Sequence, residues 1–267
     1  MSATLGGLLK DYRLQYNISQ LEVALALGWK ETSRLSRIEQ GKIFKPTREL
    51  LERIMDAMRL KEEEKNQLLY IGNYLPTREE IVKIQKIMSP IIEKIPYPVA
   101  VFDFSWRTMI NNQVLYKLFK VNISQQKYIH TLNPNIIEIV FDLRFMLNVD
   151  LKKEYKKSRR QFLHNMLVQF LFEQRSRRKE KWFLDLIKKM MPNPIFLVAW
   201  QEAIKLNFSI DSMDIPVKAV FDVENSTKIT LYLFTIIFNI DHRFNAQFYM
   251  PADRATFDYF HKEKYKY

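Results

Sequence analysis

The sequence predicts a mixed fold class, α plus α/β: an all-α domain of five short helices at the N-terminus, followed by an α+β domain. Three observations predict it. Apolar residues recur at helical spacing between small polar turns over the first 76 residues. All five glycines lie at or before Gly72, so the remaining 195 residues contain none. Aromatic and β-branched runs, typical of strands, lie near both ends of that remainder with basic helical segments between them.

The first region is predicted to contain helices over about residues 5–16, 19–27, 32–40, 47–58 and 62–75. Ser19 is a predicted N-cap, and Glu22 three residues later completes a capping box. Gly28 and Gly41 are expected to end the second and third helices. The predicted boundaries are 1–76 for this domain, 77–95 for a connecting helix over about 78–94, and 96–267 for the second domain.

The second region begins with a predicted strand over 95–105, and residues 106–112 are its expected hairpin partner. A long helical stretch covers roughly 112–205. Three further strand-like runs follow, at 217–225, 228–238 and 243–250. Strands at both ends of a helical middle predict one α+β domain whose sheet is completed by its C-terminal part.

The net charge of +12 favours anionic partners such as nucleic acid. Its distribution is uneven, because residues 1–76 hold 12 basic and 10 acidic side chains, whereas residues 150–190 hold 13 and 5. The excess charge therefore does not lie in the helical first region. The chain has no cysteine, which excludes disulfides and Cys-ligated metal sites. No apolar run approaches the roughly 20 residues of a membrane span, and no secretory signal is recognised, so a cytoplasmic protein is expected.

Catalysis is not expected, and neither a cofactor nor a metal site is predicted. The four histidines, at 130, 164, 242 and 261, lack the HxxxH and HExxH spacings of metal ligands. The glycine-rich GxGxxG and P-loop patterns are absent, as is the GxSxG pattern of a nucleophile elbow.

The stretch SRLSRIEQGKIFKP at 33–46 carries most of the functional information. On a helix, Leu35 and Ile38 fall on the inner side. The opposite face carries short hydroxyls and an arginine, from Thr32, Ser33, Ser36 and Arg37. Arginine paired with guanine is the commonest specific contact in the major groove of DNA. Such a helix, joined to a preceding one by a tight turn, is typical of a helix-turn-helix, although the same residues also suit an ordinary solvated face. Basic residues just beyond the helix are expected to meet DNA phosphates: Lys42, Lys45 and Arg48.

The segments SQLEVA at 19–24, Gly28 and SRIEQG at 36–41 give residues 5–60 a specific resemblance to the Xre family of bacterial and phage helix-turn-helix regulators. The interval from Gly28 to Gly41 is one residue longer than in the commonest form of the family, and residues 29–31 are expected to absorb it. The resemblance implies that Gln20 contacts double-stranded DNA from the first helix of the motif. It implies base-reading roles for Thr32, Ser33 and Arg37, and a structural role for Glu39 through pairing with an arginine or a cap.

Residues 96–119, with looser matches at 135–142, Trp200 and 244–253, resemble the MmyB-like ligand-binding domain, which has a PAS-like fold. This resemblance implies regulation by a small apolar ligand of the fatty-acid kind. The candidate ligand-binding residues are Phe102, Phe104, Trp106, Met109, Asn112, Phe141, Phe145, Met146, Phe196 and Trp200. For any one of these residues taken singly, plain core packing is the favoured interpretation. Asn112 suits either a ligand head group or the cap of the helix that follows it.

The basic segment 152–181 places an apolar stripe between cationic ends, from Phe162, Leu163, Met166, Leu167, Phe170 and Leu171. We favour the inward face of a helix in a soluble protein over a membrane-surface helix. The leading hypothesis is a homodimeric transcriptional regulator. Two alternatives stay open: a DNA-tethered module that binds a protein or peptide without a small-molecule ligand, and membrane association through the basic segment.

Overall fold

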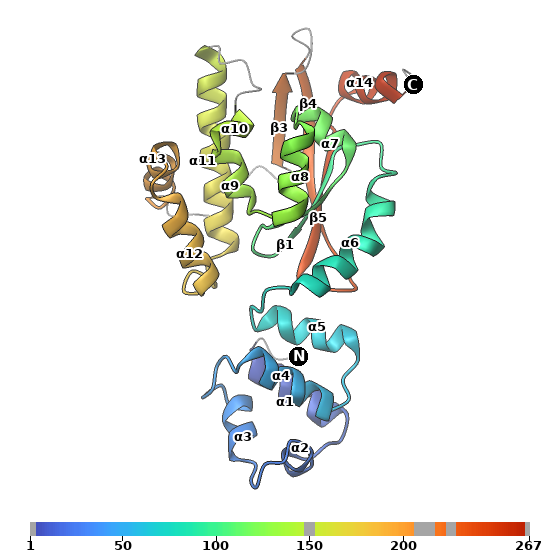
Figure 1. Cartoon of the computed structure of the whole chain (residues 1–267), viewed down its shortest axis with the longest axis vertical. Coiled ribbons are helices and arrows are strands. Elements are labelled where there is room, and N and C mark those ends of the chain that lie inside the picture. The colour runs from blue at the N-terminus through green and yellow to red at the C-terminus, as the bar shows by residue number, and fades with distance from the viewer. Residues whose placement is uncertain (1–3, 147–152, 206–216, 223–227, 265–267) are drawn as a thin grey trace. The chain divides into compact units, whose positions relative to one another are not determined.

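The computed structural model describes residues 4–146, 153–205, 217–222 and 228–264 (Figure 1). They form two compact units, the first made of Met1–Pro76 with Ile237–Phe244, and the second of Thr77–Ile236 with Asn245–Tyr267. The chain therefore passes between the units three times. The predicted mixed fold class is confirmed, because the N-terminal region is helical and the second region combines helices with a sheet.

The five predicted helices of the first unit are all present, as α1 (Leu5–Gln15), α2 (Gln20–Ala26), α3 (Ser33–Glu39), α4 (Arg48–Ala57) and α5 (Glu62–Ile71). Side-chain caps set several of their starts: Thr4 accepts from the backbone of α1, and Thr47 from that of α4. The predicted capping box of Ser19 and Glu22 is confirmed at α2. The Ser19 backbone N–H, and then its hydroxyl, hold the pKa of Glu22 below its ordinary value. This carboxylate is therefore charged at neutral pH and satisfies a free N–H at the helix start.

One apolar cluster holds the five helices together. Its fully buried members come from all five helices and include Leu8, Val23, Leu35, Ile54 and Leu68. Full burial of each such side chain contributes about 1.5–3 kcal/mol to stability. The inner side predicted for the third helix is confirmed, because Leu35 is completely buried.

Gly6 lets α1 pack closely against the end of α3. A Cβ atom at this position would lie 2.1 Å from the carbonyl oxygen of Ile38 and 2.9 Å from that of Glu39. Gly6→Ala is expected to push α3 away from α1 and to lower the free energy of unfolding by about 1–3 kcal/mol. Chemical denaturation followed by far-ultraviolet circular dichroism measures the loss. Lys10→Ala, an exposed change on the same helix, is the control, and equal stability of the two variants would contradict the close approach.

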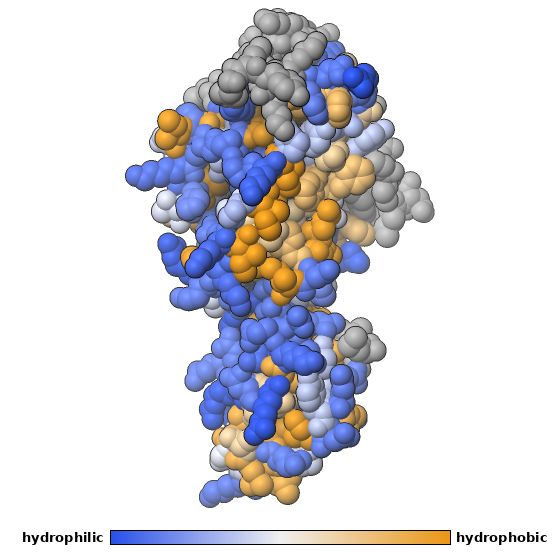
Figure 2. Space-filling model, turned by 90° about the vertical axis from the view of Figure 1, so that its right-hand side faces the viewer, coloured by the Kyte–Doolittle hydropathy of each residue, from blue (hydrophilic) through white to orange (hydrophobic). Residues whose placement is uncertain are grey.

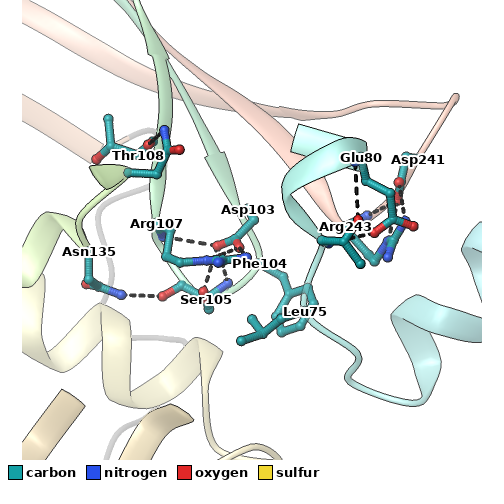
Figure 3. A network of polar contacts seen from close by, with 12 residues as sticks. Leu75, Glu80, Asp103, Phe104, Ser105, Arg107, Thr108, Asn135, Asp241 and Arg243 are labelled. Atoms are coloured by element: carbon teal, nitrogen blue, oxygen red, sulfur yellow. Dashed lines mark hydrogen bonds and ion pairs between the residues drawn. The ribbon is translucent and has the colours of Figure 1, made fainter. Parts of the chain in front are cut away.

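The turn 237–244 belongs to the first unit, although the sequence places it in the second domain. Asn66 of α5 donates from Nδ2 to the Ile240 carbonyl at 2.9 Å, and its Oδ1 accepts from Arg243 at 3.2 Å. Arg243 is fully buried and pairs with Asp241 at 2.7 Å (Figure 3). Strand patterns in the sequence predict the two flanking strands, but they do not indicate which residues the turn between them will contact.

The second unit begins with α6 (Arg78–Ile92), which corresponds to the predicted connecting helix. The predicted helical middle consists of α7 (Gln113–Leu118), α8 (Ile123–Leu132), α9 (Ile136–Phe141), α10 (Leu143–Met146), α11 (Lys153–Glu173), α12 (Lys181–Met190) and α13 (Pro194–Ala203). A further helix, α14 (Arg254–Lys264), follows the last strand and was not expected from the sequence. In Figure 1, α9, α11, α12 and α13 gather on one side of the sheet.

The sheet has five strands in the order β2-β1-β5-β4-β3. They are β1 (Val99–Asp103), β2 (Thr108–Asn111), β3 (Val217–Asp222), β4 (Lys228–Ile237) and β5 (Phe244–Pro251). The predicted hairpin at 95–112 is confirmed, because β1 and β2 pair antiparallel with Val101 opposite Ile110. β3 and β4 also pair antiparallel, from Val217 opposite Leu233 to Asp222 opposite Lys228. The C-terminal strands thus complete the sheet that β1 and β2 begin.

The apolar stripe of the basic segment 152–181 packs inside the second unit. Leu163, Leu167 and Phe170 on α11 are buried, whereas Phe162 is 42% exposed. The buried members form a cluster with side chains of α12 and α13, so the stripe is the inward face of a packed helix. Among the described residues, no helix is both long enough and apolar enough to cross a membrane.

Candidate nucleic-acid interface

The turn between α2 and α3 is set by glycine and by local backbone bonds. Helix α2 ends at Ala26 with Leu27 as its C-cap, and Gly28 follows with φ +73°, a conformation that favours glycine. The Trp29 N–H then donates to the Ala24 carbonyl at 2.8 Å. Helix α3 ends before Gly41, whose φ is +74°, and Ile43 donates its N–H to the Arg37 carbonyl at 3.0 Å. Both predicted glycine stops are confirmed.

The outer face of α3 exposes the predicted base-reading side chains. Ser33 and Arg37 are exposed, and Thr32 and Ser36 are half-buried. The Ser33 hydroxyl donates to Glu31 at 2.7 Å, and Ser36 accepts from Gln40 at 2.8 Å. Within the described part of the chain, the structure gives the Arg37 guanidinium no hydrogen-bond or ion-pair partner. An arginine on such a face has its donors available for an acceptor outside the chain.

A buried ion pair holds α3 against α1. Arg13 donates from Nε to Glu39 Oε1 at 2.6 Å and from a terminal nitrogen to Oε2 at 3.0 Å, and both side chains are less than a tenth exposed. The Gln20 amide also donates to Glu39, at 2.7 Å. Glu39 thus pairs with an arginine, as the sequence resemblance implies. Gln20 is half-buried, and one N–H of its side-chain amide is taken up by the bond to Glu39. The second N–H and the amide oxygen remain for contact with DNA.

The three predicted phosphate-contacting residues differ in their surroundings. Lys42 is exposed. Lys45 donates to the Asn73 carbonyl at 3.3 Å and lies over the Tyr74 ring. Arg48 bonds Glu52 at 2.7 Å and the Leu75 carbonyl at 2.8 Å. Lys45 and Arg48 therefore tie α4 and its preceding loop to the segment after α5, and phosphate contact by them stays a prediction.

Sequence reasoning missed Arg34 as a member of this face. Its guanidinium lies 5.2 Å from the centre of the Trp29 ring, and the side chain is exposed. The signal was present in the sequence, because positions 34 and 37 lie three residues apart and share a helix face. A cation held over an aromatic ring is pre-oriented, so Arg34 adds a second guanidinium beside Arg37.

The predicted ligand-binding residues of the second unit do not line one cavity. Phe141, Phe196 and Trp200 pack in the helical cluster, with Phe141 and Phe196 fully buried and their rings 5.2 Å apart. Phe102 belongs instead to a small cluster beside the sheet. Among the described side chains of this set, Met109 lines the open cleft that is discussed below.

Two other members of the predicted set are held by local packing. The Phe104 ring lies 6.3 Å from that of Trp182, with the Arg177 guanidinium over it. Phe145 is half-buried near Tyr128. The side chain of Met146 lies outside what the structure describes.

Asn112 caps a helix, and its side chain is occupied. The residue is completely buried. Its Oδ1 accepts from the N–H groups of Leu115 at 3.0 Å and Val99 at 3.1 Å. Its Nδ2 donates to the carbonyls of Tyr97 at 2.7 Å and Ile95 at 3.2 Å. Of the two roles that the sequence allowed, capping is the one that the geometry supports, because four protein partners leave no room for a ligand head group.

A tight turn joins β1 to β2 (Figure 3). Trp106 lies in this turn, and its backbone N–H donates to the Asp103 carbonyl at 2.9 Å. The fully buried Asp103 accepts from the Ser105 hydroxyl at 2.7 Å and from the Arg107 N–H at 3.0 Å. Its second oxygen pairs with the Arg107 guanidinium at 2.7 Å. Trp106 at the corner has φ +70° and donates from Nε1 to Glu173 at 2.7 Å. Trp106 therefore links the hairpin to α11, and the sequence had no signal for this network beyond the run DFSWR.

Comparison with known proteins bears on the N-terminal part of the chain. Residues 4–68 match the family model described as a helix-turn-helix domain. No curated protein matches the chain closely enough to be compared with it. The matched residues include α1 to α4, the capping box and the exposed face of α3. The chain therefore carries an N-terminal helix-turn-helix domain of the DNA-binding kind.

Proposed function

We propose that the protein is a sequence-specific transcriptional regulator of the Xre-like kind, acting in the cytoplasm on double-stranded DNA without enzymatic activity. The observation that carries the proposal is the exposed Ser33–Arg37 face of α3, which a buried ion pair between Arg13 and Glu39 holds in place. A rigidly mounted helix with short side chains and free guanidinium donors suits the major groove. Arg34 and Arg37 would meet base edges or phosphates there, and Lys42 would meet the backbone.

We include a homodimer in this proposal. Helix-turn-helix dimers read two half-sites about 34 Å apart, one turn of DNA. Support comes from exposed apolar side chains of the second unit, which include Ile91 on α6 at 54% and Ile236 on β4 at 54% exposure. Figure 2 shows apolar surface gathered on one face of the part that carries the sheet. Large exposed apolar patches are typical of interaction surfaces.

The proposal further assigns ligand sensing to the second unit, with a small apolar molecule of the fatty-acid kind as the ligand implied by resemblance. A ligand that binds one arrangement of the dimer better would shift the population that binds DNA. The alternative is a DNA-tethered module that recognises a protein or peptide. It is favoured by the complete burial of Phe141 and Phe196, which leaves no open space between these two predicted ligand contacts.

Arg37→Ala is expected to lower affinity for the operator by about 1–3 kcal/mol and to relax discrimination at one base pair, because one guanidinium contact is lost. The operator is first selected from a randomised DNA library, and affinities are then measured by fluorescence anisotropy. Lys10→Ala, an exposed change on α1, is the control. Unchanged discrimination in Arg37→Ala would remove Arg37 from the reading role, and failure of the selection to enrich any sequence would refute specific DNA binding.

A further inference from the structure

The second unit contains an open cleft of about 590 Å³ that neither the helix-turn-helix nor the predicted ligand residues account for. Helix α6 forms one side of it with Ser89, Pro90 and Glu93, and α8 forms another with Lys127 and His130. Strand β2 supplies the floor, and it contacts both of these helices. Cavities of about 300–1,000 Å³ are typical of small-molecule sites.

The side chains that line the cleft differ in charge between its two sides, with a carboxylate at the end of α6 and basic groups on α8. Glu93, the C-cap residue of α6, is exposed, and its carboxylate accepts from the Gln113 backbone N–H at 3.3 Å, which holds it at the end of the cleft where α7 begins. Lys127 and His130 lie three residues apart on α8, share a face and are exposed. A ligand with a cationic end and an anionic end would meet a partner at each side.

The remainder of the lining combines apolar side chains with polar ones, the latter including Asn111, Gln113 and Gln126. Met109 and Ile110 of β2 and Ile129 of α8 line the cleft and are buried. Ile123, at the start of α8, also lines it and is 84% exposed. Covering so exposed an isoleucine removes apolar surface from water and lowers the free energy. Contact with Ile123 would therefore stabilise the complex with a ligand that has an apolar body.

Tyr116 adds a neutral hydrogen-bonding group to the lining. Its hydroxyl accepts from Asn111 Nδ2 at 3.4 Å. Burial raises the pKa of this phenol above its ordinary value, so the hydroxyl keeps its proton at neutral pH and serves as a donor to a carbonyl or carboxylate oxygen.

We propose that this cleft binds a zwitterion with an apolar side chain, that is, a free amino acid or a short peptide. Glu93 receives the ammonium group, Lys127 and His130 receive the carboxylate, and Met109, Ile110 and Ile123 cover the apolar side chain. The inference rests on the proposed role of the second unit in ligand sensing and replaces the fatty-acid kind of ligand with a zwitterion. It does not depend on the DNA-binding role.

Isothermal titration calorimetry on the full chain tests the inference with four probes: leucine, the dipeptide Leu-Leu, the uncharged N-acetyl-leucinamide, and decanoate. Leucine, Leu-Leu or both are expected to bind, and N-acetyl-leucinamide at least about tenfold more weakly, since its two charged contacts are missing. Binding of the dipeptide alone identifies a peptide as the source, and binding of both shows that a free amino acid suffices. Equal binding of N-acetyl-leucinamide would overturn the inference.

The remaining outcomes separate this inference from the proposed function. Binding of decanoate without binding of leucine or the dipeptide would overturn the proposal of a zwitterionic ligand and would favour a ligand of the fatty-acid kind. Binding of none of the probes would overturn the inference, whereas the DNA-binding proposal is judged separately by the operator measurements.

Variants locate the site. Glu93→Gln and Lys127→Gln are each expected to weaken binding of the zwitterion by about tenfold or more. Lys188→Gln, an exposed change on α12, is the matched control and is expected to bind as the unchanged protein does. Glu93 also contacts α7, whereas Lys127 makes no hydrogen bond or ion pair with the residues that the structure describes. Lys127→Gln therefore decides whether the cleft is the site if Glu93→Gln loses stability. Full affinity in Lys127→Gln, or an equal loss in Lys188→Gln, would place the ligand elsewhere.

Discussion

Glu39→Ala is expected to lower the free energy of unfolding of the helix-turn-helix unit by about 3–5 kcal/mol, because it leaves a buried arginine without its counter-charge. Arg13 is 6% exposed, and both of its bonds to Glu39 are lost together. The Gln20 amide loses its acceptor at the same time. Few single substitutions cost this much, and the loss falls on the contact that positions α3.

Hydrogen exchange of the amides in α1 and α3, measured on the full chain, reports the stability of this unit separately from that of the second. The exposed Glu63→Ala on α5 is the control, and it is expected to change protection by less than about 0.5 kcal/mol. The double variant Arg13→Met with Glu39→Leu removes both charges and is expected to regain most of the loss, since apolar replacements of a buried pair are often neutral. Equal protection from hydrogen exchange in Glu39→Ala and Glu63→Ala would contradict the stabilising role of the Arg13–Glu39 ion pair.

We expect Glu39→Ala to lower operator affinity as well as stability, and Glu63→Ala to leave both nearly unchanged. Glu39 does not face outward, yet its loss frees α3 from α1 and so disturbs the Ser33–Arg37 face. Glu39→Ala is therefore expected to weaken binding to every base sequence alike, whereas Arg37→Ala alters the preference at one base pair. The two effects are distinguished by measuring affinity for single-base variants of the operator.

Asn112→Ala is expected to destabilise the second unit by about 3 kcal/mol or more, because loss of a cap costs about 1 kcal/mol and each buried group left without a partner adds about 1–3 kcal/mol. The N–H groups of Val99 and Leu115 lose their acceptor, and the Tyr97 carbonyl loses a donor. The side chain thus fastens the start of β1 to the start of α7.

Asn122→Ala provides a matched control, because Asn122 caps α8 in the same manner but is exposed. It is expected to cost only about 0.5–2 kcal/mol. Thermal unfolding followed by near-ultraviolet circular dichroism, together with hydrogen exchange of β1, measures both losses. If Asn112→Ala were as stable as the unchanged protein but lost ligand binding, the capping role would be wrong and the ligand-contact role of Asn112 would be restored.

The predictions from sequence succeeded where the determining contacts are local. The cap at Ser19, the glycine stops at 28 and 41, and the β1–β2 hairpin all depend on residues a few positions apart. Their geometry follows from backbone hydrogen bonding and from the left-handed conformations that glycine permits. Helix α14, which follows β5 directly, was not predicted from the sequence.

The sequence does not distinguish candidate ligand-binding residues from residues of the packed core. Aromatic and methionine side chains satisfy a packed core and a ligand cavity equally well, so composition does not distinguish them. The fold places Phe141 and Phe196 in contact with each other, and it places Phe102 in a different cluster. The cleft that remains open is lined mainly by other residues, among them Glu93 and Lys127, which are 34 positions apart in sequence.

The helix-turn-helix can be predicted without a structure, because its capping box, its two glycine turns and the outward face of α3 are encoded within stretches of a few residues. The partners of distant side chains become known with the three-dimensional fold alone. It pairs Arg13 with Glu39, directs Lys45 and Arg48 to the segment after α5, and joins the turn at 237–244 to Asn66. These contacts depend on how whole helices pack, and packing follows from the complementarity of complete surfaces rather than from any local pattern.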